Sequence, residues 1–143
     1  MRFGFYLPTR GPQANRRDLM AFLQTAESLG FDSVMVADHI LVPAKIDSAY
    51  PYTVGGNFLS KAECMEQITL MAFVAAATEK LRIVSSVMIV PHRNPIHCAK
   101  AIATAVVLSV GRVRVGVGVG WLEEEFKALG APEFKRRGAA TDE

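Results

Sequence analysis

Short apolar runs alternate along the chain with longer segments in which apolar residues recur every three or four positions. The short runs are typical of buried strands, and the longer spacing is typical of amphipathic helices. We expect strands over residues 2–7, 31–37, 81–90 and 112–119. Helices are expected between Asn15 and Gly30, over residues 66–78, from Pro95 to Val107, and over residues 122–129. The predicted order is therefore a strand followed by a helix, four times over.

Local signals support the ends of these helices. Asn15 can cap the first helix, with Asp18 three residues later in a variant of the capping box. Gly30 and Gly130 supply the left-handed residue that often ends a helix, and Pro95 suits a first helical turn. The segment after Gly130 is expected to be a polar tail.

Repeated strand–helix units predict an α/β fold with a parallel sheet covered by helices. Residues 1–143 contain no linker and no short repeat, so we expect a single domain. The pattern leaves two architectures open: an open doubly wound sheet, or half of an eight-stranded barrel. The connection over residues 38–65 is longer than a plain turn and is typical of a lid or binding loop.

The composition of the chain argues against binding to nucleic acid or membranes and against a metal site. The formal charge of +2 gives no reason to expect binding to nucleic acid or to an anionic membrane, and the basic residues 135–137 are interpreted as a solvated tail. The apolar run over residues 70–77 is too short to span a bilayer, and the N-terminus lacks the pattern of a signal peptide. Cys64 and Cys98 share no motif spacing. We expect a soluble cytoplasmic protein with reduced thiols and no bound metal.

Candidate chemistry gathers where the predicted strands end, because parallel α/β folds bind ligands at the carboxyl ends of their strands. Asp38 and His39 follow the second strand. A histidine in that position can exchange a proton near neutral pH, and the aspartate can anchor a ligand. The competing interpretation is that Asp38 caps the loop and His39 is structural. His92 and His97 are interpreted as structural residues.

Gly116, Gly118 and Gly120 recur at alternate positions of the fourth strand. A row of glycines on one strand face indicates close approach by a ligand or by backbone, and a flat ring would fit there. The spacing does not complete the dinucleotide fingerprint, so that interpretation is rejected. Of the three glutamates over residues 123–125, at least two are expected simply to charge a helix N-terminus.

Several of these motifs together resemble the bacterial luciferase-like monooxygenase superfamily. The matching segments run in order along the whole chain: FGFYLP (3–8), AESLGFDSV (26–34), DH (38–39), RNP (93–95), GR (111–112), GVGVGW (116–121) and EEF (124–126). The segments IDS (46–48) and YPY (50–52) are similar to a mycobacterial-type subgroup presumed to use the deazaflavin coenzyme F420.

The resemblance implies a TIM barrel, of which this chain would be the N-terminal half, four βα units. It also implies that His39 is a catalytic acid or base and that Asp38 contacts the cofactor. Ser86 and Val87 are expected to form a cis peptide behind the cofactor ring, and Gly118, Val119 and Gly120 to touch the cofactor. The implied activity is hydride transfer between F420 and a small organic substrate that the sequence does not identify.

Two departures from the family pattern limit what carries over. Some sugar-phosphate dehydrogenases of the family have a glutamate where this chain has Trp121, which argues against inheriting their substrate. Ala105 and Val106 stand where the family commonly has a leucine and an aspartate, and the missing acid is expected to cost Arg112 a partner.

Two other functions stay open beside F420 chemistry. One is an FMN-dependent luciferase-like monooxygenase, and the other is a catalytically inactive half-barrel that serves as an assembly module. Family members continue for four more βα units, so the first and fourth strands are expected to have unpaired edges. We therefore expect a homo-oligomer, in its simplest form a dimer whose first and fourth strands pair to rebuild a barrel.

Overall fold

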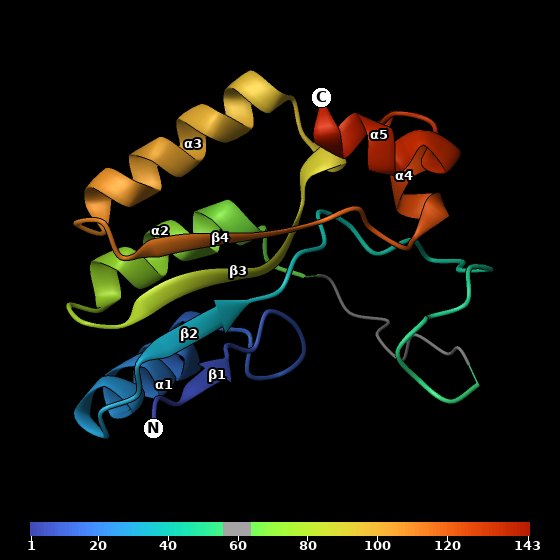
Figure 1. Ribbon diagram of the computed structural model, residues 1–143. Helices are drawn as coiled ribbons and strands as arrows, with labels where there is room; N and C mark the ends of the chain where they lie inside the picture. Colours follow the sequence, from blue (N-terminus) through green and yellow to red (C-terminus); the bar gives the residue numbers. More distant parts are fainter. Residues whose placement is uncertain (56–63) are drawn as a thin grey trace.

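Four parallel strands form one sheet in the order β1-β2-β3-β4 in the computed structural model, which describes residues 1–55 and 64–143 (Figure 1). The strands are β1 (Gly4–Tyr6), β2 (Ser33–Val36), β3 (Arg82–Ile89) and β4 (Val113–Gly118). Each lies inside its predicted run and is shorter than it. A strand order that follows the chain order is that of a barrel segment, whereas a doubly wound sheet reverses direction part-way. The half-barrel prediction is confirmed.

Three long helices cover one face of the curved sheet (Figure 1). They are α1 (Arg16–Ser28), α2 (Gln67–Ala77) and α3 (Pro95–Leu108). Alternate strand residues such as Val34, Val36 and Ile83 are fully buried against helix residues such as Leu23 and Val74. This single apolar layer between sheet and helices is the core that sets the register of the strands.

The predicted helix ends are confirmed. The Asn15 side chain accepts a hydrogen bond from the Asp18 backbone N–H at 3.0 Å and caps α1. Pro95 is the first residue of α3, after the cap Asn94. Gly30 has φ +78° just after α1, and Gly130 has φ +62° after the short helix α4 (Glu123–Leu129).

Arg112 has several hydrogen-bond partners, although the aspartate that is common in the family is missing. Its guanidinium donates hydrogen bonds to the backbone carbonyls of Ala75, Thr78, Leu81 and Ser109. Two of these carbonyls lie at the C-terminal end of α2, where the helix dipole favours a cation. Backbone oxygen atoms therefore bind the Arg112 guanidinium in this chain.

The segment after Gly130 is folded, which corrects the prediction of a polar tail. It forms a 3₁₀ turn, η2 (Phe134–Arg136), and the helix α5 (Arg137–Asp142). The Arg137 guanidinium lies 4.0 Å from the centre of the Phe134 ring and donates to the Gly120 carbonyl at 3.1 Å. Arg137 thus holds this segment against the end of β4. The basic cluster is partly structural rather than fully solvated.

Both edge strands expose apolar side chains. In the described part of the chain β1 pairs only with β2, and β4 pairs only with β3. Phe3 and Tyr6 are more than half exposed at one edge, and Val115, Val117 and Val119 are 40–57% exposed near the other. Among the described residues, no helix is both long and apolar enough to cross a bilayer.

These edges predict that the chain of residues 1–143 self-associates, because unpaired apolar strand edges recruit further strands. Size exclusion with light scattering should give a mass of at least two copies of the 15.6 kDa chain. Val115→Lys, which places a charge at the β4 edge, should shift the population toward monomer. Val107→Lys, on the exposed side of α3, is the control and should leave the mass unchanged. A monomeric wild-type chain would contradict the prediction.

Candidate functional site

The carboxyl ends of the strands border a hollow of about 560 Å³, here called the strand-end hollow. It contains all the site residues predicted from the sequence and several aromatic side chains. Its lining residues are Arg10, Ala37, Asp38, His39, Tyr50, Tyr52, Ser86, Val87, Ile89, Val117, Gly118, Val119, Gly120 and Trp121. A neighbouring hollow of about 580 Å³ shares Tyr50, Tyr52, Ser86 and Val87 and continues toward Tyr6 and Thr9. Each volume lies within the range of roughly 300–1,000 Å³ that is usual for small-molecule sites.

Asp38 is buried and holds the ends of β2 and β3 together. Its carboxylate accepts hydrogen bonds from the Ile89 backbone N–H at 2.7 Å and from both terminal nitrogens of Arg93 at 2.7 and 2.8 Å. Burial would lower the pKa of Arg93, but the Asp38 and Glu66 carboxylates raise it above its ordinary value. Both Asp38 oxygens therefore accept hydrogen bonds from groups of this chain. Contact between Asp38 and a cofactor stays a prediction.

His39, the next residue, points its ring nitrogen at a different carboxylate. Its Nδ1 lies 2.7 Å from Oε2 of Glu125, at the start of α4, and both side chains are largely or fully buried. The other Glu125 oxygen, Oε1, accepts from the backbone N–H groups of Ile40 and Leu41. Burial alone would raise the pKa of Glu125, but the His39 hydrogen bond and the nearby histidines lower it. Glu125 is an ionised carboxylate that orients His39.

A second glutamate of α4 anchors the same long loop further along. Oε1 of Glu124 accepts from the backbone N–H groups of Asp47 and Ser48 at 2.8 and 2.9 Å. Burial would raise the pKa of Glu124, but hydrogen bonds from Ser48 and Asp47 lower it to about 2. The expectation that at least two of the three glutamates only charge a helix end was wrong: only Glu123, which pairs with Lys127, fits it.

These two glutamates hold the candidate site in place, and the sequence prediction missed them. The signal available was an acidic run placed directly after the glycine-rich strand end, combined with a long loop earlier in the chain. Nothing in the spacing connects Glu125 with His39, because 86 residues separate them in the chain. Arg93 belongs to the RNP segment of the resemblance, but nothing in the sequence pairs it with Asp38.

Aromatic rings border the hollow beside His39. The ring centres of Tyr50 and Trp121 are 4.9 Å apart, those of Tyr50 and Tyr52 are 5.5 Å apart, and His39 stands edge-on to Trp121 at 6.2 Å. Because Glu124 anchors residues 47 and 48, it also places Tyr50 in this group. The arrangement offers flat apolar surfaces to a ligand with only a few polar groups nearby.

The Ser86–Val87 peptide is cis, as the resemblance implied. It lies where the β3–β4 register shifts, between Ser85 and Met88. The Ser86 hydroxyl is 2.6 Å from the Tyr6 hydroxyl, which connects the middle of β3 with the end of β1.

The glycines of β4 leave space that neighbouring atoms of the same chain occupy. A Cβ on Gly116 would come within 2.7 Å of the Ser85 carbonyl oxygen, and one on Gly118 within 2.5 Å of the Val87 side chain. Gly120 has φ +80° and lies against Phe126 and Ile89. Close approach by neighbouring chain atoms therefore explains the row, so a ring ligand is not needed to account for it. Ligand contact by Gly118, Val119 and Gly120 stays a prediction.

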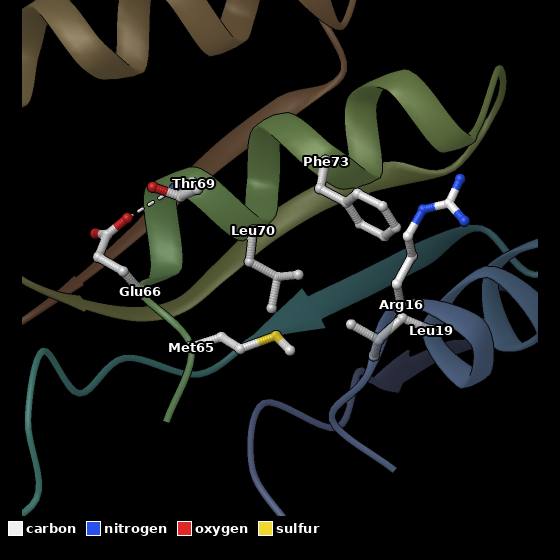
Figure 2. Close-up of a pocket in the computed structure, with 7 residues that line it drawn as sticks. All are labelled: Arg16, Leu19, Met65, Glu66, Thr69, Leu70 and Phe73. Atoms are coloured by element: carbon white, nitrogen blue, oxygen red, sulfur yellow. Dashed lines mark hydrogen bonds between the residues drawn. The ribbon is translucent and has the colours of Figure 1, made fainter. Parts of the chain in front are cut away.

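A separate apolar pocket of about 400 Å³ lies between α1 and α2 (Figure 2). Leu19, Leu70 and Phe73 line it, and at one end Glu66 caps α2 through the Thr69 backbone N–H. None of the site residues predicted from the sequence lies there. Over residues 1–55 and 64–143, no three His, Cys, Asp or Glu side chains are grouped so as to hold a metal ion.

Comparisons with known proteins match the chain throughout. The profile of the luciferase-like monooxygenase family matches residues 1–143. A protein of Mycobacterium tuberculosis is 33% identical over 143 residues, which is 99% of this chain and 45% of the relative. The F420-dependent glucose-6-phosphate dehydrogenase of Amycolatopsis mediterranei is 37% identical over 128 residues, 87% of this chain and 34% of that enzyme. The chain therefore spans less than half the length of these relatives.

A solved structure has a similar fold. The crystal structure of a monooxygenase from Streptomyces bottropensis superimposes with a TM-score of 0.69 at 26% identity. The match covers 99% of this chain and 40% of that protein.

The buried Asp38–Arg93 pair leads to a first prediction for the site. Asp38→Ala should lower the free energy of unfolding by about 3–5 kcal/mol, because it leaves Arg93 charged and short of its main partner. Urea denaturation of the variant measures the loss. Asp18→Ala, at the half-buried start of α1, is a carboxylate control and should cost no more than about 1 kcal/mol. Equal losses for the two variants would contradict a special role for Asp38.

The anchoring role of Glu124 leads to a second prediction for the site, which concerns the pH dependence of stability. Its folded-state pKa of about 2 lies below its ordinary value of 4.5, so its contribution is complete above pH 4.5 and is lost as the pH falls through 2. Glu124→Gln should therefore melt below wild type at neutral pH, and the difference in Tm should shrink as the solution is acidified. Glu123→Gln is the matched control. A difference in Tm that does not vary with pH would count against the anchor.

Proposed function

This chain belongs to the luciferase-like monooxygenase family, and from that premise we propose that it forms the cofactor-binding half of an F420-dependent oxidoreductase. The observation that carries the proposal is the placement of His39. It borders the strand-end hollow and is held at Nδ1 by a buried carboxylate. A histidine oriented by a carboxylate at a ligand site is a common arrangement for acid–base catalysis.

The residues around the hollow suit a flat, largely apolar ring. Val87, Val117 and Val119 offer apolar surface, and Tyr50 and Trp121 offer aromatic surface. When bound, F420 supplies hydride-transfer chemistry, while the protein orients the reactants and moves the accompanying proton. His39 is the residue proposed to hold or release that proton. Ser86, Gly118 and Gly120 are proposed to line the cofactor side.

The choice of F420 over FMN rests on relatives whose sequences are similar. A relative that is 37% identical is named for F420 dependence, and the sequence segments 46–48 and 50–52 point the same way. An FMN-dependent monooxygenase is the second candidate. The 26% identical structure with the same fold is a monooxygenase, which favours that type of activity. The substrate is proposed to be a small organic molecule. Because the relatives are more than twice as long, turnover is proposed for a complete barrel.

Fluorescence titration of the chain with F420 and, separately, with FMN tests the choice of cofactor. Saturable quenching of F420 at lower concentration than FMN supports the proposal. Preference for FMN favours the monooxygenase, and the absence of binding by either would favour an inactive assembly module.

His39→Ala is expected to lower turnover in the complete enzyme by about 10²–10⁴-fold, since the variant loses acid–base assistance. Its affinity for F420 in the fluorescence titration should change much less. Turnover is followed by the absorbance of F420 with a panel of alcohols and sugar phosphates as hydride donors. His97→Ala, an exposed histidine on α3, is the control. A His39→Ala variant with wild-type turnover would make His39 structural.

A further inference from the structure

Glu125 is completely buried, and three nitrogen atoms lie within hydrogen-bond distance of its carboxylate oxygens. The backbone N–H groups of Ile40 and Leu41 lie 2.8 and 3.2 Å from Oε1, and Nδ1 of His39 lies 2.7 Å from Oε2. A backbone N–H can only donate, so Oε1 is committed to the loop. An ionised carboxylate has only acceptors, so Oε2 requires a proton on Nδ1 of His39.

We propose that Glu125 is a positioning residue that fixes the proton of neutral His39 on Nδ1 and thereby makes Nε2 the nitrogen at which His39 gains or loses a proton. The two ring nitrogens of a histidine are chemically distinct, and the hydrogen bond made by one decides the protonation of the other. The role of Nε2 in turnover rests on the proposed function. The position of the proton on the ring does not, because it follows from contacts inside this chain.

A second buried histidine lies on the other side of Glu125. Nδ1 of His92 is 3.7 Å from Oε1, beyond hydrogen-bond distance, and neither ring nitrogen of His92 has a hydrogen-bond partner among the described residues. Burial lowers the pKa of His92 although the charge of Glu125 opposes the shift. Phe126 packs against the ring at 4.5 Å. His92 is thus neutral, and the Glu125 charge acts mainly on His39.

Three other charged groups near this pair, Asp38, Arg93 and Glu66, form ion pairs with one another. Asp38 is bound by Arg93, and Arg93 also pairs with Glu66 at 3.0 Å. Cys64 donates its thiol proton to the His39 carbonyl oxygen at 2.9 Å, and burial raises the pKa of that thiol. The Glu125 carboxylate lies within hydrogen-bond distance of Nδ1 on the His39 ring.

The chain has three histidines, so nitrogen NMR can assign each ring. Protein labelled with ¹⁵N-histidine, without any cofactor, is recorded over a pH series that reaches the neutral form of each ring. Neutral His39 should carry its proton on Nδ1. His97, exposed on α3, serves as the internal reference for a ring in solvent. A neutral His39 protonated on Nε2 in the wild-type chain would overturn the proposal.

Glu125→Gln sharpens the test because it should move the proton. The two backbone N–H groups will keep the amide oxygen at the position of Oε1, which places the amide NH₂ at the position of Oε2. Nδ1 of His39 must then accept, so neutral His39 should carry its proton on Nε2. Glu123→Gln removes the same charge from the same turn of α4 and should leave the Nδ1 proton in place. An unchanged His39 spectrum in a folded Glu125→Gln variant would also overturn the proposal.

The result is separable from the cofactor assignment. If neither F420 nor FMN binds but the proton of His39 moves as expected, the function fails and the positioning role stands. If the cofactor binds but neutral His39 carries its proton on Nε2, the positioning role fails alone. Should Glu125→Gln not fold, the wild-type spectrum still decides the question.

Discussion

A buried ion pair between Asp38 and Arg93 holds the site end of this fold together. Asp38 lies at the end of β2, and Arg93 follows the end of β3. The bidentate contact and the bond to the Ile89 backbone N–H fix the two strand ends side by side. His39 and the Ser86–Val87 peptide, which border the strand-end hollow, depend on that alignment because His39 follows Asp38 directly and the peptide precedes Ile89.

The adjacent residues Asp38 and His39 therefore have different tasks. One completes a structural ion pair, and the other faces a hollow and is oriented by Glu125. Separate carboxylates for structure and for the candidate acid–base residue allow the histidine to change protonation without breaking the ion pair. The Asp38–Arg93 pair would keep the strand ends aligned through such a change.

Helix α4 organises the long loop that has no regular structure of its own in its described part. Glu125 binds backbone N–H groups at its start, and Glu124 binds two more near its middle. These bonds satisfy backbone groups that would otherwise need water, and they place Tyr50 beside Trp121. A short acidic helix thereby shapes one wall of the hollow, while the glycines of β4 admit the irregular end of β3 on another.

The sequence alone determined the order of strands and helices, the helix caps and the gathering of the predicted site residues at one end of the sheet. These follow from periodicity and from backbone rules that act within a few residues, such as the caps at Asn15 and Pro95. The resemblance added the barrel and the cis peptide at Ser86–Val87. Tertiary structure alone decided which side chains meet: Glu125 with His39, Arg93 with Asp38, and Arg112 with backbone carbonyls. Such pairings depend on contacts between segments that lie tens of residues apart in the chain. A charged residue in a sequence does not show whether its partner is water, backbone or another buried charge.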